Sequence, residues 1–274
     1  MGIPGEAVLT TAKPAEALTF EQYKIRALLS STGSGAGKTT GACSIPGKKL
    51  LLDFDNRSEA IAGWPNVTII KKLLHEKDPR SPKAWDAAKR LKDEIWRAVD
   101  KEEWEYDVLI VDGISAMLRI CMYWALTLDP KKGLGDSPAK QHWGPQMKHV
   151  SDWLLSMLGL PCHVVVTCHE KIMQDKMSGK MHFLPMITGT LAPEVPKWFN
   201  ETYWCWRDCN QETKRYKFFW QTQGSGTREY LKSSMNQLQK YWSDPIRVDF
   251  KKAPTGFQDL LVKRFGDAAK GGGK

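Results

Sequence analysis

The sequence predicts an α/β protein with a mostly parallel central sheet, helices on both faces of that sheet and an antiparallel hairpin at one edge. Strand-like and helix-like segments alternate along most of the chain, which is typical of a parallel sheet. The strand-like segments are apolar without alternation, as expected for strands that helices cover on both sides. Two aromatic-rich segments after residue 200 follow each other closely and indicate the antiparallel hairpin.

Short apolar runs predict the positions of the strands. The parallel strands are expected at 25–31, 48–55, 67–70, 106–112 and 162–168. The two strands of the hairpin are expected at 201–207 and 215–222. Because the strands of a parallel sheet all run in one direction, their carboxyl ends are expected to open onto a shared edge of the sheet.

Helical spacing of apolar residues predicts the helices. One helix is expected at 82–100, because Ser81 and Pro82 form a helix start and apolar residues recur behind them at helical spacing. Other helices are expected at 115–128, at 146–158 and around 257–265. Segments rich in glycine, proline and charge are expected to be long loops, at 129–145 and 170–190.

Length and composition fit a folded protein that attracts polyanions. The 274 residues are 42 % hydrophobic and 26 % charged, which excludes disorder as the main state, and the formal net charge is +9. We expect an N-terminal arm at 1–20, a folded core at 21–245 and a short helix with a flexible Gly- and Lys-rich tail at 246–274. No secretory signal or membrane-spanning run is apparent, so a cytoplasmic protein without a membrane partner is expected.

A glycine-rich loop after the first predicted strand gives the clearest chemical signal. It ends in the GKT sequence of a phosphate-binding P-loop. The residues expected to surround the phosphates of Mg-ATP are Thr32, Gly33, Ser34, Gly35, Ala36, Gly37, Lys38, Thr39 and Thr40. Lys38 is expected to reach the β- and γ-phosphates and the Thr39 hydroxyl to coordinate Mg²⁺. Thr32 replaces the first glycine of the usual pattern, so the entry into the loop is expected to be constrained.

Polar side chains at the ends of other strands are candidates for catalysis. Asp112 ends the strand 106–112, where a carboxylate can hold a Mg²⁺-bound water or, alternatively, cap the next helix. Asp55 ends the second strand and can activate the attacking water, unless it is a solvated turn residue. His169 follows the strand 162–168 and is either a γ-phosphate sensor or a structural histidine.

The order of these motifs resembles one known family. GAGKTT, LLDFD, YDVLIVDGISAM and HVVVTCHEK are similar to the RecA-core ATP-binding proteins of bacteriophages, some of which are single-strand annealing recombinases. The resemblance covers roughly residues 25–235 and implies a RecA-like P-loop NTPase that uses ATP and Mg²⁺ in the cytoplasm of a bacterial host. It assigns catalysis to Asp55, Mg²⁺ binding to Asp112 and the sensor role to His169. The family usually has Glu at the position of Asp55, so slow hydrolysis is expected.

The resemblance also implies partners. In RecA-like proteins the loop after the sensor strand contacts single-stranded DNA, and here that loop is expected to use Lys171, Lys176, Lys180 and Phe183. An ordinary lysine-rich surface loop is the alternative, and 131–143 is a second candidate DNA-binding segment. Such ATPases form filaments or rings in which a neighbour's basic residue reaches the nucleotide. Arg228 or Lys232 is expected to take that role.

The leading functional hypothesis is therefore an ATP-dependent recombinase or annealing protein that assembles on single-stranded DNA. A helicase-like or loader motor ATPase is an alternative, although 274 residues leave little room for further motor domains. A small-molecule phosphotransferase is a third hypothesis, and its usual arginine-rich lid is not apparent.

Overall fold

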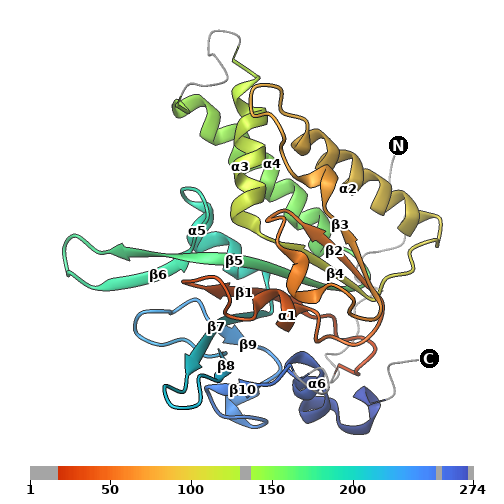
Figure 1. Ribbon diagram of the computed structural model, residues 1–274, viewed down its shortest axis with the longest axis vertical. Helices are drawn as coiled ribbons and strands as arrows, with labels where there is room; N and C mark the ends of the chain where they lie inside the picture. Colours follow the sequence, from red (N-terminus) through yellow and green to blue (C-terminus); the bar gives the residue numbers. More distant parts are fainter. Residues whose placement is uncertain (1–17, 130–136, 251–254, 271–274) are drawn as a thin grey trace, which may run out of the picture.

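A computed structural model describes residues 18–129, 137–250 and 255–270. The described strands form one sheet in the order β10-β8-β7-β1-β5-β4-β2-β3, with β6 paired to β5 and β9 paired to β7 (Figure 1). The strands are β1 (Arg26–Ser31), β2 (Lys49–Asp53), β3 (Val67–Ile70), β4 (Val108–Asp112), β5 (His163–Gln174), β6 (Met181–Pro185), β7 (Glu201–Cys209), β8 (Tyr216–Gln221), β9 (Lys232–Ser233) and β10 (Ile246–Val248).

The predicted fold class is confirmed. Strands β7, β1, β5, β4, β2 and β3 pair in parallel, and the hairpin of β7 and β8 adds antiparallel pairing at one edge. Successive residues of the central strands contribute to two separate cores. Leu28, Leu109 and Val164 belong to one core, whereas Leu29, Ile110 and Val165 belong to the other. The sheet is therefore covered on both faces, which explains its unalternated apolar strands.

The helices divide between the two faces of the sheet. They are α1 (Lys38–Ala42), α2 (Ala84–Asp100), α3 (Ile114–Leu126), α4 (Lys140–Leu158), α5 (Leu191–Glu194) and α6 (Phe257–Phe265). Short 3₁₀ turns lie at Ser58–Ile61, Lys72–Leu74, Val195–Trp198, Gln237–Gln239 and Gly266–Ala269. Helices α2, α3 and α4 pack together on one face, and α6 lies below the opposite face, beside the antiparallel edge (Figure 1). No helix among the described residues is both long and apolar enough to cross a membrane.

Helix α4 begins earlier than the sequence pattern predicted. Residues 140–145 were expected in a loop because they include Gly144 and Pro145, but they form the first turns of α4. Contacts with α3 favour the helix there: Gln146 is buried and its side-chain amide donates to the Leu118 carbonyl at 2.7 Å. His142, part of the second candidate DNA-binding segment, is buried as well. Residues 130–136 lie outside the described part.

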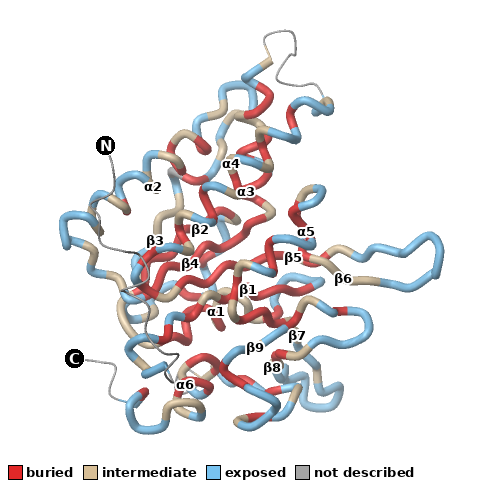
Figure 2. Tube along the Cα trace, turned by 180° about the vertical axis from the view of Figure 1, so that it is seen from behind, coloured by how far each residue is buried: buried red, intermediate tan, exposed pale blue. Residues whose placement is uncertain are grey.

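The expected loop 170–190 is wrong at 170–174 and 181–185, which form strands. Strand β5 continues to Gln174 and pairs with β6 in the antiparallel register Glu170↔Pro185 to Gln174↔Met181. The turn between them is fixed by Asp175, whose carboxylate accepts hydrogen bonds from the backbone N–H groups of Met177 and Ser178. We call residues 170–185 the β5–β6 arm. It projects away from the body of the protein, and its outer part is exposed (Figures 1 and 2).

The C-terminal segment packs against the body of the protein. Strand β10 pairs with β8, and Phe257, Leu260 and Leu261 of α6 are buried in the same core as β1. Gly266–Ala269, expected in the flexible tail, forms a 3₁₀ turn with Ala269 buried. The division of the chain near residue 245 stays a prediction, and residues 1–17 of the expected N-terminal arm and residues 271–274 of the tail lie outside the described part.

Candidate functional site

The glycine-rich loop lies between β1 and α1, at the carboxyl end of the central strand. Gly35 has φ 73° and Gly37 has φ 82°, a left-handed backbone that favours glycine at both positions. Thr32 is exposed and is not among the residues of positive φ, so its backbone stays out of the left-handed region that favours glycine. The expected constraint of its β-branched side chain on the loop entry stays a prediction.

Lys38 is held in reach of the loop interior. Its Nζ donates to the Ser31 hydroxyl at 2.6 Å and lies 3.5 Å from the Gly33 carbonyl oxygen. The Ser31 hydroxyl in turn donates to the Gly33 carbonyl. Within the described part of the chain Lys38 forms no ion pair with a carboxylate. Its positive charge thus remains available for an anionic ligand, as the P-loop prediction requires.

Asp112 forms the second part of the site. Its carboxylate accepts hydrogen bonds from the hydroxyls of Thr39 at 2.9 Å and Thr167 at 2.5 Å. The Thr39 hydroxyl and one Asp112 oxygen are thus adjacent, which suits Mg²⁺ because this ion is usually bound by one or two protein groups together with the phosphates and water. These two residues would hold the ion, which when bound would neutralise charge on the phosphates.

Burial raises the pKa of Asp112 to about 6, and the nearby carboxylates of Asp55 and Asp53 act in the same direction. The hydroxyls of Thr167 and Thr39 oppose this rise by stabilising the ionised form. Asp53 lies opposite Asp112 in the pairing of β2 with β4. The site therefore concentrates negative charge, and a bound cation would relieve the cost of that charge.

We expect Asp112→Asn to stabilise the protein in the absence of Mg²⁺ and nucleotide. The folded-state pKa lies above the unfolded value, so the folded state binds more protons between about pH 4 and pH 6 and loses stability as the pH rises through this window. At pH 8 the variant should exceed the parent by about 1–3 kcal/mol in free energy of unfolding, and at pH 4 the two should be equal. Urea denaturation at both pH values measures this, and a less stable variant at pH 8 would contradict it.

Asp55 lies beside the end of β4. A Cβ on Gly113 would overlap the Asp55 carboxylate, so the close approach of the two segments requires glycine, which also has φ 97°. Asp53 fixes the turn that follows, because its carboxylate accepts from the backbone N–H groups of Arg57 at 3.2 Å and Ser58 at 3.1 Å. Asp53 is thus a structural residue, whereas the half-buried Asp55 faces the site next to Asp112.

His169 lies opposite Ser31 in the pairing of β5 with β1. Burial lowers the pKa of its imidazole, and the positive charges of Lys38 and Arg57 lower it further, while Asp55 raises it. A neutral imidazole near Lys38 can exchange hydrogen bonds with a phosphate oxygen without adding charge. The structure therefore brings together the predicted residues Lys38, Thr39, Asp55, Asp112 and His169, although their individual roles stay predictions.

Sequence reasoning missed several residues of this site. Thr167 was overlooked although it is a polar residue inside the buried run VVVTC, which is a recognisable signal. Ser31 directly precedes the predicted phosphate-binding residues, and its hydroxyl accepts a hydrogen bond from Lys38. Arg57 and Arg207 had no local signal, because only the folded chain brings them near His169 and Gly35 respectively.

The predicted DNA-binding residues lie on or next to the β5–β6 arm, but they differ in availability. Lys176 is exposed in the turn of the arm. Lys180 pairs with Glu229 at 2.7 Å, with both side chains exposed. Lys171 lies at the base of the arm and donates to the Ile187 carbonyl at 2.9 Å. One face of the Phe183 ring is covered by the Arg228 guanidinium, 3.8 Å from the ring centroid, so that face is not free to stack on a base.

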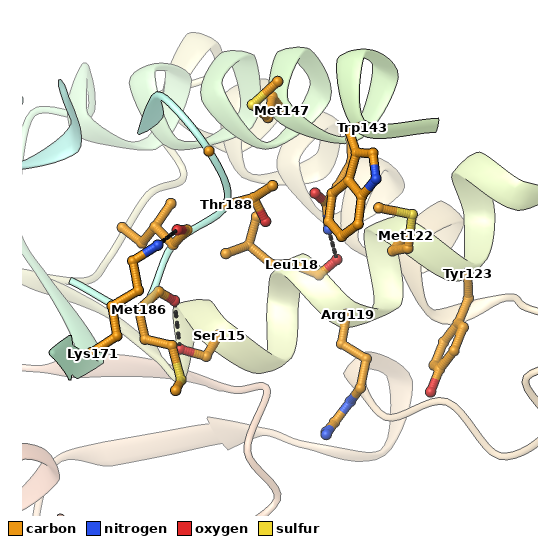
Figure 3. A pocket seen from close by; sticks show the side chains of 13 residues that line it. Ser115, Leu118, Arg119, Met122, Tyr123, Trp143, Met147, Lys171, Met186 and Thr188 are labelled. Atoms are coloured by element: carbon orange, nitrogen blue, oxygen red, sulfur yellow. Dashed lines mark hydrogen bonds between the residues drawn. The ribbon is translucent and has the colours of Figure 1, made fainter. Parts of the chain in front are cut away.

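A cavity of about 660 Å³ adjoins the base of the arm (Figure 3). Side chains of α3 and α4, including Leu118, Met122, Trp143 and Met147, give it a mostly apolar lining. Lys171 and Arg119 extend along its rim (Figure 3). The P-loop residues do not line this cavity, so it is separate from the phosphate site.

Arg228 is not available to a neighbouring subunit, and that prediction is corrected. Its guanidinium forms a bidentate pair with Glu170, with distances from 2.9 to 3.2 Å, and the side chain is 9 % exposed. It is also enclosed between the rings of Phe183 and Trp204. Burying both partners makes this pair structural, since separating it would leave the Glu170 carboxylate unpaired. Lys232 is exposed, and its proposed role in a neighbouring site stays a prediction.

Comparison with solved structures finds a distant similarity. The chain is similar to the flagellar accessory protein FlaH from Methanocaldococcus jannaschii, with a TM-score of 0.37 and 9 % sequence identity, over 86 % of this chain and 90 % of that one. A search of curated proteins finds no match.

Comparison with protein families gives a broader match. Residues 26–230 match the AAA domain family, and this range contains the P-loop, Asp55, Asp112 and His169. The match extends from the first residue of β1 to the segment that follows β8. With this match over most of its length and a P-loop sequence at the end of the central strand of a mostly parallel sheet, the chain belongs to the AAA domain family.

Proposed function

We propose that this protein binds and hydrolyses Mg-ATP and couples the nucleotide state to binding of single-stranded DNA, as an annealing or recombination protein of phage type. The observation that supports hydrolysis is the convergence of Lys38, the Thr39–Asp112 pair and Asp55 at the end of β1. Lys38 binds the terminal phosphates, and Asp55 orients or accepts a proton from the attacking water. His169 contacts the γ-phosphate and distinguishes ATP from ADP.

The β5–β6 arm is the proposed DNA contact. It extends directly from His169 along the same strand, so the sensor and the arm share a continuous backbone. Its lysines Lys171, Lys176 and Lys180 can neutralise phosphates, and the net charge of +9 favours approach of a polyanion. Exposed apolar side chains on the arm, such as Ile172 and Met177, offer contacts to unstacked bases.

A buried polar network supports coupling between the phosphate loop and the arm. Glu170, next to His169, pairs with Arg228 and accepts a hydrogen bond from the Tyr230 hydroxyl. The same hydroxyl lies 2.7 Å from the hydroxyl of Ser30, just before the P-loop. A shift of β1 against β5 on nucleotide binding would therefore change these hydrogen bonds and could move the base of the arm.

Self-assembly into a filament or ring completes the proposal. The nucleotide would lie between subunits, with Lys232 of the neighbouring copy as the trans-acting residue, because Arg228 is buried. Lys232 is exposed on β9, which pairs with β7 at the antiparallel side of the sheet.

ATPase activity measured with single-stranded DNA, with duplex DNA and without DNA tests this function. We expect stimulation by single strands alone, and a rate per molecule that rises with protein concentration as copies assemble. Equal rates in all three conditions would contradict the proposed coupling to DNA and would indicate an ATPase with a different function. A rate independent of protein concentration would contradict the shared nucleotide site.

DNA binding through the arm predicts a specific salt dependence. Replacing Lys171, Lys176 and Lys180 by Gln should flatten the slope of log affinity against log salt by about 0.7 for each DNA phosphate that the variant no longer neutralises. Lys176→Gln alone should account for about one such phosphate. Fluorescence anisotropy of a labelled oligonucleotide at several salt concentrations measures the slope.

The matched control for this experiment replaces Lys72, Lys77 and Lys101 by Gln. These lysines are exposed and lie outside the arm, and their replacement removes the same amount of charge. The control should lower affinity slightly and leave the slope near that of the parent. If both triple variants change the slope equally, the DNA contact is not on the arm.

A further inference from the structure

The catalytic groups lie on one side of β1, which defines the direction of a bound nucleotide. Asp112, Asp55 and His169 belong to β4, the segment after β2, and β5, all on the same side of β1 in the sheet order. The γ-phosphate of the proposed ligand therefore faces that side. Since a nucleoside triphosphate is a linear arrangement of phosphates, sugar and base, the nucleoside must extend toward the other side, where β7, β8 and β10 lie.

Phe218 of β8 and Phe250, which follows β10, lie against the end of the P-loop. A Cβ on Gly37 would lie 2.9 Å from Phe250 Cε2 and 3.2 Å from Phe218 Cδ1. A Cβ on Gly35 would lie 3.0 Å from Nη1 of Arg207. Glycine at position 37 thus lets the loop pass this close to the two rings, whereas the flexible end of Arg207 could move away from a side chain at position 35. The loop and the antiparallel edge form one continuous surface.

A pocket of about 360 Å³ adjoins this surface; residues of the β7–β8 turn, β8 and β10 line it, and the P-loop is not part of its lining. Phe218 and Phe250 belong to its lining, together with Tyr216, Arg215 and Arg247. The rings of Phe218 and Phe250 lie 5.5 Å apart at 59°, so they form an aromatic corner rather than a closed stack. Pockets for small ligands typically measure about 300–1,000 Å³ and combine aromatic walls with a few polar groups. This pocket falls in that volume range and has aromatic walls, and most of its other lining residues are polar or charged, among them Lys217 and Asp249.

We infer that the pocket lined by β8, β10 and the turn before β8, which adjoins the P-loop through Phe218 and Phe250, binds the base and sugar of the nucleotide, with these two rings as the surfaces for the base. The inference rests on the proposed nucleotide-binding function and adds the nucleoside subsite to it. A planar base packs against one ring and meets the edge of the other. Arg207, which stacks on Tyr216 at 4.4 Å, lies between this pocket and the phosphate loop and is placed to meet the phosphates nearest the sugar.

Binding of ATP and of inorganic tripolyphosphate separates this subsite from the phosphate site. Phe250→Ala and Phe218→Ala should each weaken ATP binding about tenfold, because base–aromatic stacking contributes on that scale. Binding of tripolyphosphate, which has no base, should stay within about twofold of the parent. Phe250→Trp keeps an aromatic surface and should retain most of the ATP affinity. Isothermal titration calorimetry measures both ligands.

Phe219→Ala is the matched control. Phe219 is half-buried next to Phe218 on β8, but it points to the opposite face, where it stacks on Trp206 at 5.2 Å. Its removal should leave the ATP affinity unchanged. Equal weakening of ATP and tripolyphosphate by Phe250→Ala would overturn the inference, as would a parent that binds the two ligands equally tightly, and both results leave the P-loop assignment intact. A parent that binds neither ligand would refute the proposed function and this subsite together.

Discussion

Lys38→Ala should reduce the ATPase rate at least about a hundredfold, the usual effect of removing a charged group that stabilises a transition state. The lysine is half-buried, forms no ion pair with a carboxylate in the described part of the chain, and is held toward the loop interior by Ser31 and Gly33. These neighbours keep their mutual hydrogen bond when Lys38 is shortened, so the fold should persist. Phosphate release from ATP, followed with a coupled assay, measures the decrease.

The matched control is Lys101→Ala, which removes the same charge from an exposed position after α2. It should hydrolyse ATP at the parent rate. Circular dichroism of both variants checks that the fold is retained. A Lys38→Ala protein that is folded and fully active would show that the GKT sequence is not a functional P-loop.

The fold was predictable because local pattern and global architecture agree. Continuous apolar runs at β1, β4 and β5 could be placed inside a sheet covered on both faces, and the observed cores use alternate residues of these strands on each side. The P-loop and the acids at strand ends could be predicted for a related reason. In a parallel sheet the carboxyl ends of the strands meet at one edge. Because Asp112 ends one strand and Lys38 follows the end of another, their places in the sequence are enough to predict that they lie near each other.

What could not be predicted depends on contacts between distant segments. Residues 170–190 have the composition of a loop, but pairing between β5 and β6 gives part of this segment regular structure. No local sequence pattern predicts that pairing. Arg228 resembles an exposed basic residue in sequence, although its partner Glu170 lies 58 positions away. The aromatic corner of Phe218 and Phe250 depends in the same way on β10 pairing with β8.

The remaining large effect concerns Asp55, which we expect to act in turnover rather than in binding. Asp55→Asn should lower the hydrolysis rate about a hundredfold, within the range by which a positioned general base accelerates reactions. ATP affinity should change little, because the Thr39–Asp112 pair and Lys38 remain in place. The amide is close in shape to the carboxylate, so it still fits against Gly113.

Two comparisons distinguish this role from a general effect of charge. Glu59→Gln removes a carboxylate four residues away, on the surface beside Lys71, and should leave turnover unchanged. Asp112→Asn should instead weaken ATP binding that depends on Mg²⁺, because it removes the charge next to Thr39. Single-turnover hydrolysis and equilibrium binding, measured on all three variants, separate the two steps. If Asp55→Asn turns over as fast as Glu59→Gln, then Asp55 is a turn residue and the attacking water must be activated by another group, for which His169, in electrostatic reach of both Lys38 and Asp55, is the nearest candidate.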